Sequence, residues 1–276
     1  MDDYGRLFRL DGKAAVLTGG GGILAGAMAE GLGRAGARVA LCDLFPEKAA
    51  AAAERLAGLG IEARGYEMDV MNPTAIREAA ETIYQDLGRV DVLINAAGGN
   101  LKDATTSPDL SFFDLEVEPL QKVIGLNLLG GAILPSQAFG KWMKEQPEGA
   151  SIINISSMSA LAPLTRIPGY SAAKAAVSNF TQWLAVHFAQ EYNPRLRVNA
   201  LAPGFFLTEQ NRFLLTDEKT GGLTARGQAV IDHTPMGCFG DPDDLIGATL
   251  WLAGEASRFV TGTVIAIDGG FSVYSI

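Results

Sequence analysis

Short apolar runs alternate along this chain with longer stretches that have helical spacing. The apolar runs predict strands at Ala14–Leu17, Arg38–Cys42, Ile61–Met68, Val90–Ile94, Ser151–Ile155, Arg195–Leu201 and Thr263–Ile267. The stretches between them predict helices at Ile23–Ala35, Glu47–Leu59, Pro73–Leu87, Leu120–Gln146, Tyr170–Gln190 and Asp241–Leu252. Strands that alternate with helices in this way indicate βαβ crossovers and a parallel sheet. Because the runs are apolar throughout, we expect helices on both faces of the sheet.

This pattern predicts a single α/β domain of the doubly wound class over residues 1–276, with a seven-stranded and mainly parallel sheet. The stretch Phe205–Thr234 breaks the alternation, since it is long, mixed in polarity and contains Gly221-Gly222. We interpret residues 205–234 as a substrate-covering excursion across the carboxyl ends of the strands, where such sheets bind ligands. A surface insertion without a function is the alternative.

Composition and charge narrow the class of partner. Apolar residues make up 48% of the 276 residues and charged residues 19%, as in a globular protein with a sizeable core. The 22 basic and 31 acidic residues give a net charge of −9, which argues against a nucleic acid partner, because phosphate binding needs a basic surface. Cys42 and Cys238 lie far apart and form no CxxC motif, so we expect no metal site.

The chain also lacks the patterns of a secreted or membrane protein. Its first residues, MDDYGRLFRLDGK, contain no apolar core of a secretory signal. The uncharged stretch Ala14–Ala29 has 16 residues and contains four consecutive glycines, so it is short and interrupted for a membrane span. We therefore expect a cytoplasmic protein without a membrane partner.

A glycine-rich turn follows the first predicted strand directly. Residues 18–25 are TGGGGILA, and glycines at this place let backbone N–H groups approach a pyrophosphate at a helix N-terminus. Glycine clusters also form plain turns, so the placement after a strand is what favours a ligand site. The turn predicts a dinucleotide site whose contacting residues are Gly19, Gly21, Gly22, Ile23 and Leu24.

Asp43 ends the second predicted strand, 24 residues after Gly19. A carboxylate there can accept hydrogen bonds from both ribose hydroxyls of NAD and would repel the 2′-phosphate of NADP. Since Leu44, Phe45 and Pro46 follow and no arginine does, we predict NAD (NADH) as the cofactor. The alternative is that Asp43 only caps the next helix.

Two further strand ends extend the predicted cofactor site. Asp69 follows the third strand and could receive the adenine amino group, with the Val70 backbone beside it. Asn95, Ala96 and Gly98 end the fourth strand among small residues, against which a flat ligand can lie. Asn95 could equally be a structural residue that bonds to neighbouring turns.

Ser157, Tyr170 and Lys174 form the sharpest chemical constellation. Tyr170 and Lys174 are four residues apart and share one helix face, and Ser157 ends the strand that leads to that helix. A lysine ammonium about 4 Å from a phenol is worth roughly 4 kcal/mol at an effective dielectric of about 20, an upper bound of about three pKa units. We expect Lys174 to lower the pKa of Tyr170 towards the working pH, where a phenol can transfer protons.

These motifs occur in the order found in the short-chain dehydrogenase/reductase family, which the chain resembles over nearly its whole length. The resemblance implies a Rossmann fold and hydride transfer between an alcohol carbon and carbon 4 of a nicotinamide. It rests on Thr18-Gly19, Asp69, Asn95-Ala96-Ala97-Gly98, Asn127, Ser157, Tyr170-Ser-Ala-Ala-Lys174, Asn199, Pro203-Gly204 with Thr208, and Asp268-Gly269-Gly270.

The resemblance implies a role for each residue of the site. Tyr170 would be the general acid or base, and Ser157 would hydrogen-bond the substrate oxygen. Lys174 would lower the pKa of Tyr170 and hold the nicotinamide ribose, and Asn127 would hold a water in a proton relay to Lys174. The nicotinamide would be seated by Pro203, Gly204, Phe206 and Thr208. The resemblance also implies a homotetramer built on the long helices.

Two details of the motifs differ from or refine the family pattern. The pattern TGxxxGxG has Ile23 and Ala25 here in place of its second and third glycines, so we expect the turn to differ locally. Ser156 and Ser159 flank the predicted catalytic serine. Ser157 is preferred because it precedes Tyr170 by 13 residues, the usual spacing in the family.

Polar side chains near this site predict a small anionic sugar-acid substrate. Arg166 lies between Ser157 and Tyr170, Arg212 lies in the excursion, and Asn100 follows the fourth strand. Arginine can bind a carboxylate through two parallel hydrogen bonds. The segments NAAGGN, PLTRIPGYSAAKAAVSNFTQWLAVHFA and APGFFLTEQNRFLL resemble the D-mannonate oxidoreductase, or fructuronate reductase, branch of the family. That resemblance implies interconversion of D-mannonate and D-fructuronate.

Three alternatives to this prediction stay open. A dehydrogenase of another polyol or sugar acid, of the gluconate type, would share these features. A nucleotide-binding protein without catalysis is disfavoured, because folding does not require Asn127, Ser157, Tyr170 and Lys174 together. An acyl-carrier-protein ketoreductase usually favours NADP and a basic docking patch, and both Asp43 and the net charge argue against it.

Overall fold

The computed structural model describes residues 4–217 and 220–275, so the outermost residues of the predicted domain and part of the predicted excursion lie outside it. A seven-stranded sheet with the order β3-β2-β1-β4-β5-β6-β7 forms its centre, and every pair of neighbours is parallel. The predicted doubly wound α/β class is confirmed. The strands are β1 Ala14–Thr18, β2 Arg38–Asp43, β3 Ala63–Glu67, β4 Val92–Asn95, β5 Ala150–Ile155, β6 Leu196–Pro203 and β7 Val264–Ile267.

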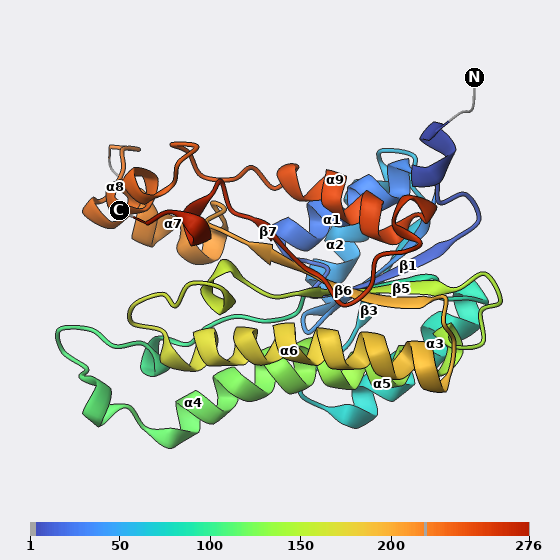
Figure 1. Ribbon diagram of the computed structural model, residues 1–276, viewed down its shortest axis with the longest axis horizontal. Coiled ribbons are helices and arrows are strands. Elements are labelled where there is room, and N and C mark those ends of the chain that lie inside the picture. The colour runs from blue at the N-terminus through green and yellow to red at the C-terminus, as the bar shows by residue number, and fades with distance from the viewer. Residues whose placement is uncertain (1–3, 218–219, 276) are drawn as a thin grey trace.

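Helices cover both faces of the sheet, as expected (Figure 1). Successive residues of β1 point to opposite faces, so Val16 packs in one apolar cluster and Ala15 and Leu17 pack in the other. One layer contains α1 Ile23–Arg34, α2 Pro46–Ala57 and α9 Asp244–Ala253, and the other contains α3 Pro73–Leu87, α4 Val117–Ile124, α5 Leu134–Met143 and α6 Pro168–Glu191.

The edge strand β3 differs from the prediction. We expected an apolar run over Ile61–Met68, but the strand is shorter, and Arg64 and Glu67 are exposed. Its outer edge has no neighbouring strand in the described sheet, so water reaches side chains there. Continuous burial holds for the central strands β1, β4 and β6, whose residues are all buried.

The predicted helix Leu120–Gln146 consists of three segments and begins earlier, at Val117. Residues Gly125–Ile133 between α4 and α5 are π-helical, a rare geometry that often marks functional sites. The whole run Val117–Met143 is long and apolar enough to cross a membrane, a feature that the sequence analysis did not consider. However, 61% of its most apolar window is buried inside the fold, which is typical of a core helix.

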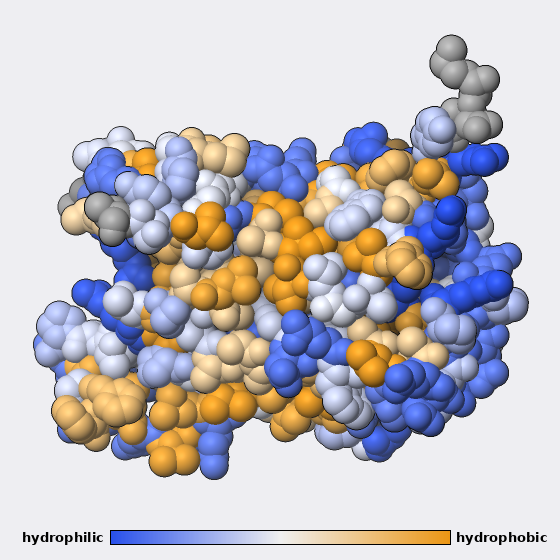
Figure 2. Space-filling view, viewed as in Figure 1, coloured by the Kyte–Doolittle hydropathy of each residue, from blue (hydrophilic) through white to orange (hydrophobic). Residues whose placement is uncertain are grey.

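The excursion contains two helices, α7 Glu209–Leu215 and α8 Ala225–His233, which lie beyond the carboxyl ends of the strands (Figure 1). Figure 2 shows a recess in the outline at this end, between the α7–α8 region and the segment that precedes α4. Short 3-10 helices complete the described elements: Tyr4–Phe8, Lys102–Ala104, Phe112–Asp114, Met158–Ala160, Glu255–Ser257 and Phe271–Val273.

Candidate active site

The glycine turn after β1 brings three chain segments together. The Thr18 hydroxyl accepts hydrogen bonds from the N–H groups of Ala96 and Ala97, each at 3.0 Å, and so joins the ends of β1 and β4. Gly19 has a φ of 64°, and a Cβ there would lie 3.0 Å from the Ala97 backbone. Gly22 is the N-cap of α1, whose first turn therefore opens beside the strand ends.

The two departures from the family pattern fit this turn. Ile23 is the first residue of α1 and its side chain is 40% exposed, so its bulk meets solvent. Ala25 is buried, and its methyl group is accommodated in the α1 layer. The backbone instead lies close to neighbouring side chains at the early glycines. A Cβ at Gly21 would lie 2.7 Å from Cβ of Lys48 and 2.9 Å from Oδ2 of Asp43.

Asp43 links the glycine turn to the loop after β2. Its Oδ2 accepts from the Gly21 N–H at 3.0 Å, and its Oδ1 accepts from the Phe45 N–H at 3.1 Å. The N-cap of α2 is Phe45, so the Asp43 side chain does not cap that helix directly. A carboxylate held beside the turn in this way can still accept hydrogen bonds from ribose hydroxyls.

Lys48 is a neighbour of this carboxylate that the sequence analysis did not identify. It lies in the first turn of α2, beside Gly21, and its ammonium is 5.1 Å from the centre of the Phe45 ring. The residues that follow Asp43 directly, Leu44, Phe45 and Pro46, carry no positive charge. The first turn of α2 places Cβ of Lys48 beside Gly21, as Oδ2 of Asp43 is, although Lys48 lies five positions further along the chain.

The predicted adenine and strand-end residues have mixed placements. Asp69 is partly exposed, and its Oδ1 accepts from the Met71 N–H at 2.8 Å, next to the nearly buried Val70. The Asn95 amide is fully buried and donates to Oδ1 of Asn154 at 2.8 Å and to the Ser136 hydroxyl at 3.0 Å. This geometry favours the structural interpretation of Asn95, because its side chain faces the interior.

Ser157 has the geometry of a hydrogen-bond donor for a reacting oxygen. Its hydroxyl oxygen accepts from the Ser159 N–H at 3.1 Å and from the Ser159 hydroxyl at 3.0 Å, which leaves its own proton free to point elsewhere. Ser156 is occupied differently, since its hydroxyl contacts the Lys174 carbonyl at 3.1 Å and the Ser178 hydroxyl at 2.7 Å. The structure therefore gives the three serines different environments, and Ser157 is the one beside Tyr170.

Tyr170 and Lys174 lie on the first two turns of α6, with the Lys174 Nζ 5.7 Å from the centre of the Tyr170 ring. Lys174 is 4% exposed, and its ammonium donates to the Ile155 carbonyl at 2.8 Å. Burial lowers the pKa of Lys174 to about 8. Burial raises the pKa of Tyr170, and a hydrogen bond with Ser157 acts in the opposite direction.

This result corrects the expected lowering of the Tyr170 pKa. The calculation from spacing used a contact of about 4 Å and no burial. In the structure, removal of the phenolate from water is the largest influence on the Tyr170 pKa, and the hydrogen bond with Ser157 offsets only part of it. At neutral pH the described protein therefore holds a neutral phenol beside a mostly charged lysine.

Asn127 lies fully buried in the π-helical segment and close to this pair. Its amide donates to the carbonyls of Gly99 at 2.6 Å and Val123 at 2.8 Å, and its Oδ1 accepts from the Gly99 N–H at 3.1 Å. A Cβ at Gly98 would lie 2.7 Å from Oδ1 of Asn127 and 3.2 Å from Nζ of Lys174. Gly98 thus lies against both predicted catalytic residues, and a larger residue would push into them.

The segment after β6 passes close to the other strand ends. Gly204 donates to the Ile267 carbonyl at 2.9 Å, and a Cβ there would lie 2.6 Å from Cα of Asp268. The Phe206 side chain is buried in the apolar core, so only its backbone can contact a ligand. Thr208 is the N-cap of α7, and its N–H donates to Oδ1 of Asn211 at 2.8 Å.

Two arginines, Arg166 and Arg226, have no carboxylate within 4 Å among the side chains that the structure describes, which leave out that of Glu209. Arg166 is exposed and has a φ of 73°, rare for a residue with a side chain. Arg226, on α8, is partly buried. Burial lowers the pKa of Arg226 and the like charge of Arg166 lowers it further, so the two guanidinium groups lie near each other. Arg226 was not among the residues predicted from the sequence.

The other two predicted substrate residues are less engaged with this arginine pair. Arg212 is exposed on α7, and Asn100 is exposed in the loop after β4. The Asn100 amide donates to the Thr105 hydroxyl at 2.8 Å, which holds the loop in shape. No cluster of three or more potential metal-ligating residues is found in the part of the chain that the structure describes.

The residues present fit a nicotinamide dinucleotide. A helix N-terminus opens at the glycine turn, Asp43 offers a carboxylate at the end of β2, and the Gly98 and Gly204 surfaces have no room for side chains. Ser157 and Tyr170 lie at one end of this set of residues, and Lys174 lies next to Tyr170. Such a site can exchange a proton with a substrate oxygen at the place where a dinucleotide ends.

Comparison with known proteins agrees with this geometry. Residues 22–272 match the family model described as Enoyl-(Acyl carrier protein) reductase. The chain is 46% identical over 275 residues to the uncharacterized oxidoreductase UxuB of Bacillus subtilis (strain 168), covering 96% of this chain and 97% of that protein.

Solved structures are similar over the whole fold. A protein of Haemophilus influenza named as a D-mannonate oxidoreductase, with bound NAD, is 44% identical with a TM-score of 0.88, and the match covers 97% of each chain. A gluconate 5-dehydrogenase of Burkholderia cenocepacia J2315, in complex with NADP and tartrate, is 32% identical with a TM-score of 0.86, covering 98% of this chain and 99% of that one. The chain therefore belongs to the short-chain dehydrogenase/reductase family, whose members are nicotinamide-dependent oxidoreductases that act on alcohol groups.

Proposed function

We propose that this protein is an NAD(H)-dependent oxidoreductase that interconverts D-mannonate and D-fructuronate. The observation that carries the proposal is the pair Arg166 and Arg226, from the loop before α6 and from α8, with no carboxylate partner in the described residues. Two unpaired guanidinium groups near a proton-transfer site suit a substrate carboxylate. The likeness to the NAD-bound Haemophilus protein supports the choice of sugar acid.

The protein's own groups can carry the proton steps of a ketone reduction. The neutral Tyr170 phenol donates its proton to the substrate oxygen, and the free Ser157 proton stabilises the charge that develops there. The positive charge of the Lys174 ammonium then lies close to the Tyr170 phenolate and partly offsets its negative charge. Asn127 and Lys174 both lie against Gly98, so Asn127 is beside the route by which a proton would reach Lys174. The bound dinucleotide would supply or accept the hydride.

We propose Gly19, Gly21, Gly22, the α1 start at Ile23 and Leu24, and Asp43 as the NAD contacts at the adenosine and pyrophosphate end. Asp43 supports NAD over NADP because its carboxylate would repel a 2′-phosphate. Further contacts would come from Asp69, Val70, Ala96, Gly98, Pro203, Gly204, the Phe206 backbone and Thr208. Residues 205–234, with α7 and α8, would cover the substrate.

A substrate panel with purified wild-type protein tests the proposal. We expect turnover of D-fructuronate with NADH, and a KM for this substrate that rises about tenfold or more in Arg226→Ala, because a hydrogen-bonded charge pair is worth about 1.5–3 kcal/mol. Arg77→Ala, which changes an exposed arginine on α3, is the matched control and should leave KM unchanged. No turnover of fructuronate together with good turnover of another keto-sugar would refute the proposed substrate.

A gluconate-type substrate is the second candidate, favoured by the similarity to the Burkholderia gluconate 5-dehydrogenase. The same panel separates the two, because D-fructuronate and 5-keto-D-gluconate both carry the ketone at carbon 5 but differ in configuration at carbon 2, so a specific site turns one over faster than the other. Tyr170→Phe tests catalysis itself: we expect turnover of every substrate to fall by about 10²–10⁴-fold while NADH binding persists. Equal turnover in that variant would refute Tyr170 as the proton donor.

We also propose a homotetramer assembled on α5 and α6, in the cytoplasm, where a dinucleotide-dependent reaction has its cofactor pool. An apolar groove of about 550 Å³ lies between these helices, lined by Phe180, Leu184 and Phe188, and Trp183 on its rim is 57% exposed. Exposed aromatic side chains are enriched at subunit interfaces. Light scattering after size exclusion tests the tetramer, and Trp183→Glu should reduce the measured mass.

A further inference from the structure

A second cavity lies at the end of the sheet opposite the catalytic residues. It has a volume of about 650 Å³ and lies where β4, β5 and β6 begin, whereas Ser157 and Pro203 mark the other ends of β5 and β6. Cavities of roughly 300–1,000 Å³ are the usual size of small-molecule sites. Figure 2 shows that hydrophilic residues dominate this right-hand end of the molecule, unlike the apolar surface across its middle.

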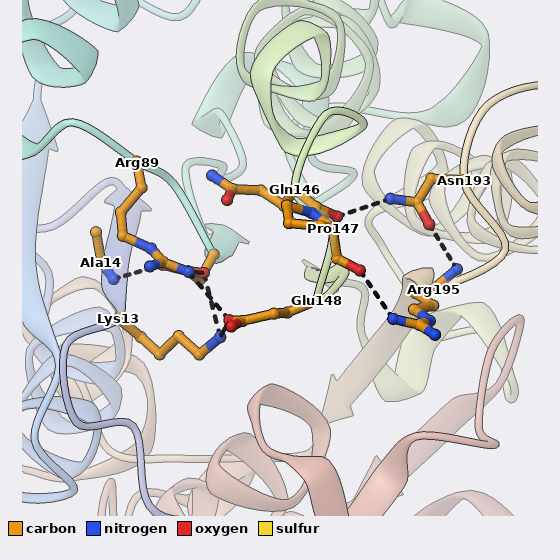
Figure 3. Close-up of polar contacts among 9 residues, drawn as sticks. Lys13, Ala14, Arg89, Gln146, Pro147, Glu148, Asn193 and Arg195 are labelled. Atoms are coloured by element: carbon orange, nitrogen blue, oxygen red, sulfur yellow. Dashed lines mark hydrogen bonds and ion pairs between the residues drawn. The ribbon is translucent and has the colours of Figure 1, made fainter.

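The carboxylates on one wall of this cavity are already neutralised. Arg89 binds Asp91 through two parallel hydrogen bonds of 2.7 and 2.8 Å, and Lys13 binds Glu148 at 2.6 Å (Figure 3). Arg89 also reaches Glu148 at 3.4 Å, and the Ala14 N–H donates to Asp91 at 2.9 Å. A third cation, Arg9, binds Asp11 at 2.9 Å and is likewise paired.

Three further arginines line the same cavity without such a partner: Arg195, Arg197 and Arg258. Among the side chains that the structure describes, no carboxylate lies within 4 Å of any of the three. Arg195 donates to the Pro147 carbonyl at 2.9 Å, so one of its nitrogens is fixed to the wall (Figure 3).

Arg197 is the strongest of these observations, because it is only 8% exposed. Its guanidinium donates to the Ser257 hydroxyl at 2.9 Å and to the Gly254 carbonyl at 3.3 Å, which are neutral partners. Burial lowers the pKa of Arg197, and the charge of Glu255 opposes this. A buried charge without a paired counter-charge is unfavourable, and Glu255 is the one acid of the lining with no ion pair in the described residues.

We propose that this cavity binds a compact anion with two or three negative groups, a polycarboxylate or a phosphate ester. Three guanidinium groups against one free carboxylate give the cavity a local positive charge in a chain whose net charge is −9. Guanidinium groups bind carboxylates and phosphates through paired hydrogen bonds. The site is separate from the sugar-acid site, since the two lie at opposite ends of the same strands.

Isothermal titration calorimetry at low ionic strength tests this site. Citrate and pyrophosphate are the probes for the two chemistries, acetate is the single-charge control, and saturating NADH keeps the probes out of the dinucleotide site. The exposed arginines are changed first, as Arg195→Gln and Arg258→Gln, because replacement of the buried Arg197 could impair folding. Arg64→Gln, on the distant edge strand β3, is the matched control.

We expect citrate or pyrophosphate to bind more tightly than acetate, and each cavity variant to weaken binding by about tenfold or more, which corresponds to about 1.4 kcal/mol. Arg64→Gln should change the affinity less than twofold. Tighter binding of citrate identifies a polycarboxylate and tighter binding of pyrophosphate a phosphate ester. Three results would overturn the proposal. Neither probe binds, or Arg195→Gln and Arg258→Gln bind the probes as tightly as wild type, or Arg226→Ala loses the binding while these two variants keep it.

Discussion

Replacement of Lys174 by methionine should stabilise the protein while it removes activity. The lysine is 4% exposed, and burial lowers its pKa from 10.5 to about 8. A shift of this size means that the buried charge of Lys174 lowers the free energy of unfolding by about 3 kcal/mol at pH 7, because one pKa unit is worth about 1.36 kcal/mol. Methionine has a similar length and carries no charge.

The variant also loses the hydrogen bond from Lys174 to the Ile155 carbonyl, worth about 1 kcal/mol. The net gain in free energy of unfolding at pH 7 is therefore about 2 kcal/mol, or roughly 4–8 °C in melting temperature for a domain of this size. The gain depends on pH. Between the folded pKa near 8 and the unfolded value of 10.5, the unfolded chain binds more protons, so wild-type stability rises with pH and approaches that of the variant.

Urea unfolding of both proteins at pH 7, 9 and 10.5 measures this difference directly. Other titrating groups, Tyr170 included, affect both proteins alike and largely cancel in the comparison. Lys102→Met, which replaces an exposed lysine, is the matched control and should change stability by less than about 0.5 kcal/mol. A Lys174→Met protein that is less stable than wild type at pH 7, or a stability difference that does not shrink with pH, would refute the reasoning about the buried charge.

Three other variants probe separate parts of the site. Asp43→Ser should raise kcat/KM with NADPH relative to NADH by at least about tenfold, and a second change, Lys48→Met, should remove that gain if Lys48 receives the phosphate. Ser159→Ala should lower kcat about tenfold with KM little changed, because Ser157 loses a hydrogen bond that orients it. Asn154→Ala should lower the free energy of unfolding by about 2–4 kcal/mol in a urea titration, since it breaks two buried hydrogen bonds, to the Asn95 amide and to a hydroxyl of α6.

The alternation of strands and helices was sufficient to predict the fold, because each central strand carries a continuous apolar run that only a doubly covered sheet can bury. The edge strand β3 was harder to place, since Arg64 and Glu67 face water and weaken the pattern. The π-helical segment Gly125–Ile133 has no signal in the helical period. Its glycines allow close packing: a Cβ at Gly130 would lie 2.6 Å from the Val70 carbonyl.

Residues of the candidate site could be predicted where they are close to one another in the sequence, or where they directly follow the end of a predicted strand. Ser157, Tyr170 and Lys174 could be placed together on these grounds, and the structure places Ser157 and Lys174 beside Tyr170. Arg226 could not, because 60 positions separate it from Arg166 and only the folding of α8 brings the two charges together. Lys48 was missed for the same kind of reason, since the first turn of α2 places it beside Gly21.

Spacing also predicts which groups meet, but burial decides which of them is charged. The spacing of Tyr170 and Lys174 predicts that the lysine charge lowers the pKa of the tyrosine. In the structure burial moves each pKa towards the neutral form, upward for the partly buried phenol and downward for the fully enclosed ammonium. At neutral pH the pair therefore presents a neutral phenol, which is the form that can donate a proton to a ketone oxygen. The reverse reaction needs the phenolate, whose formation the desolvated site opposes until a substrate oxygen or a cofactor charge stabilises it.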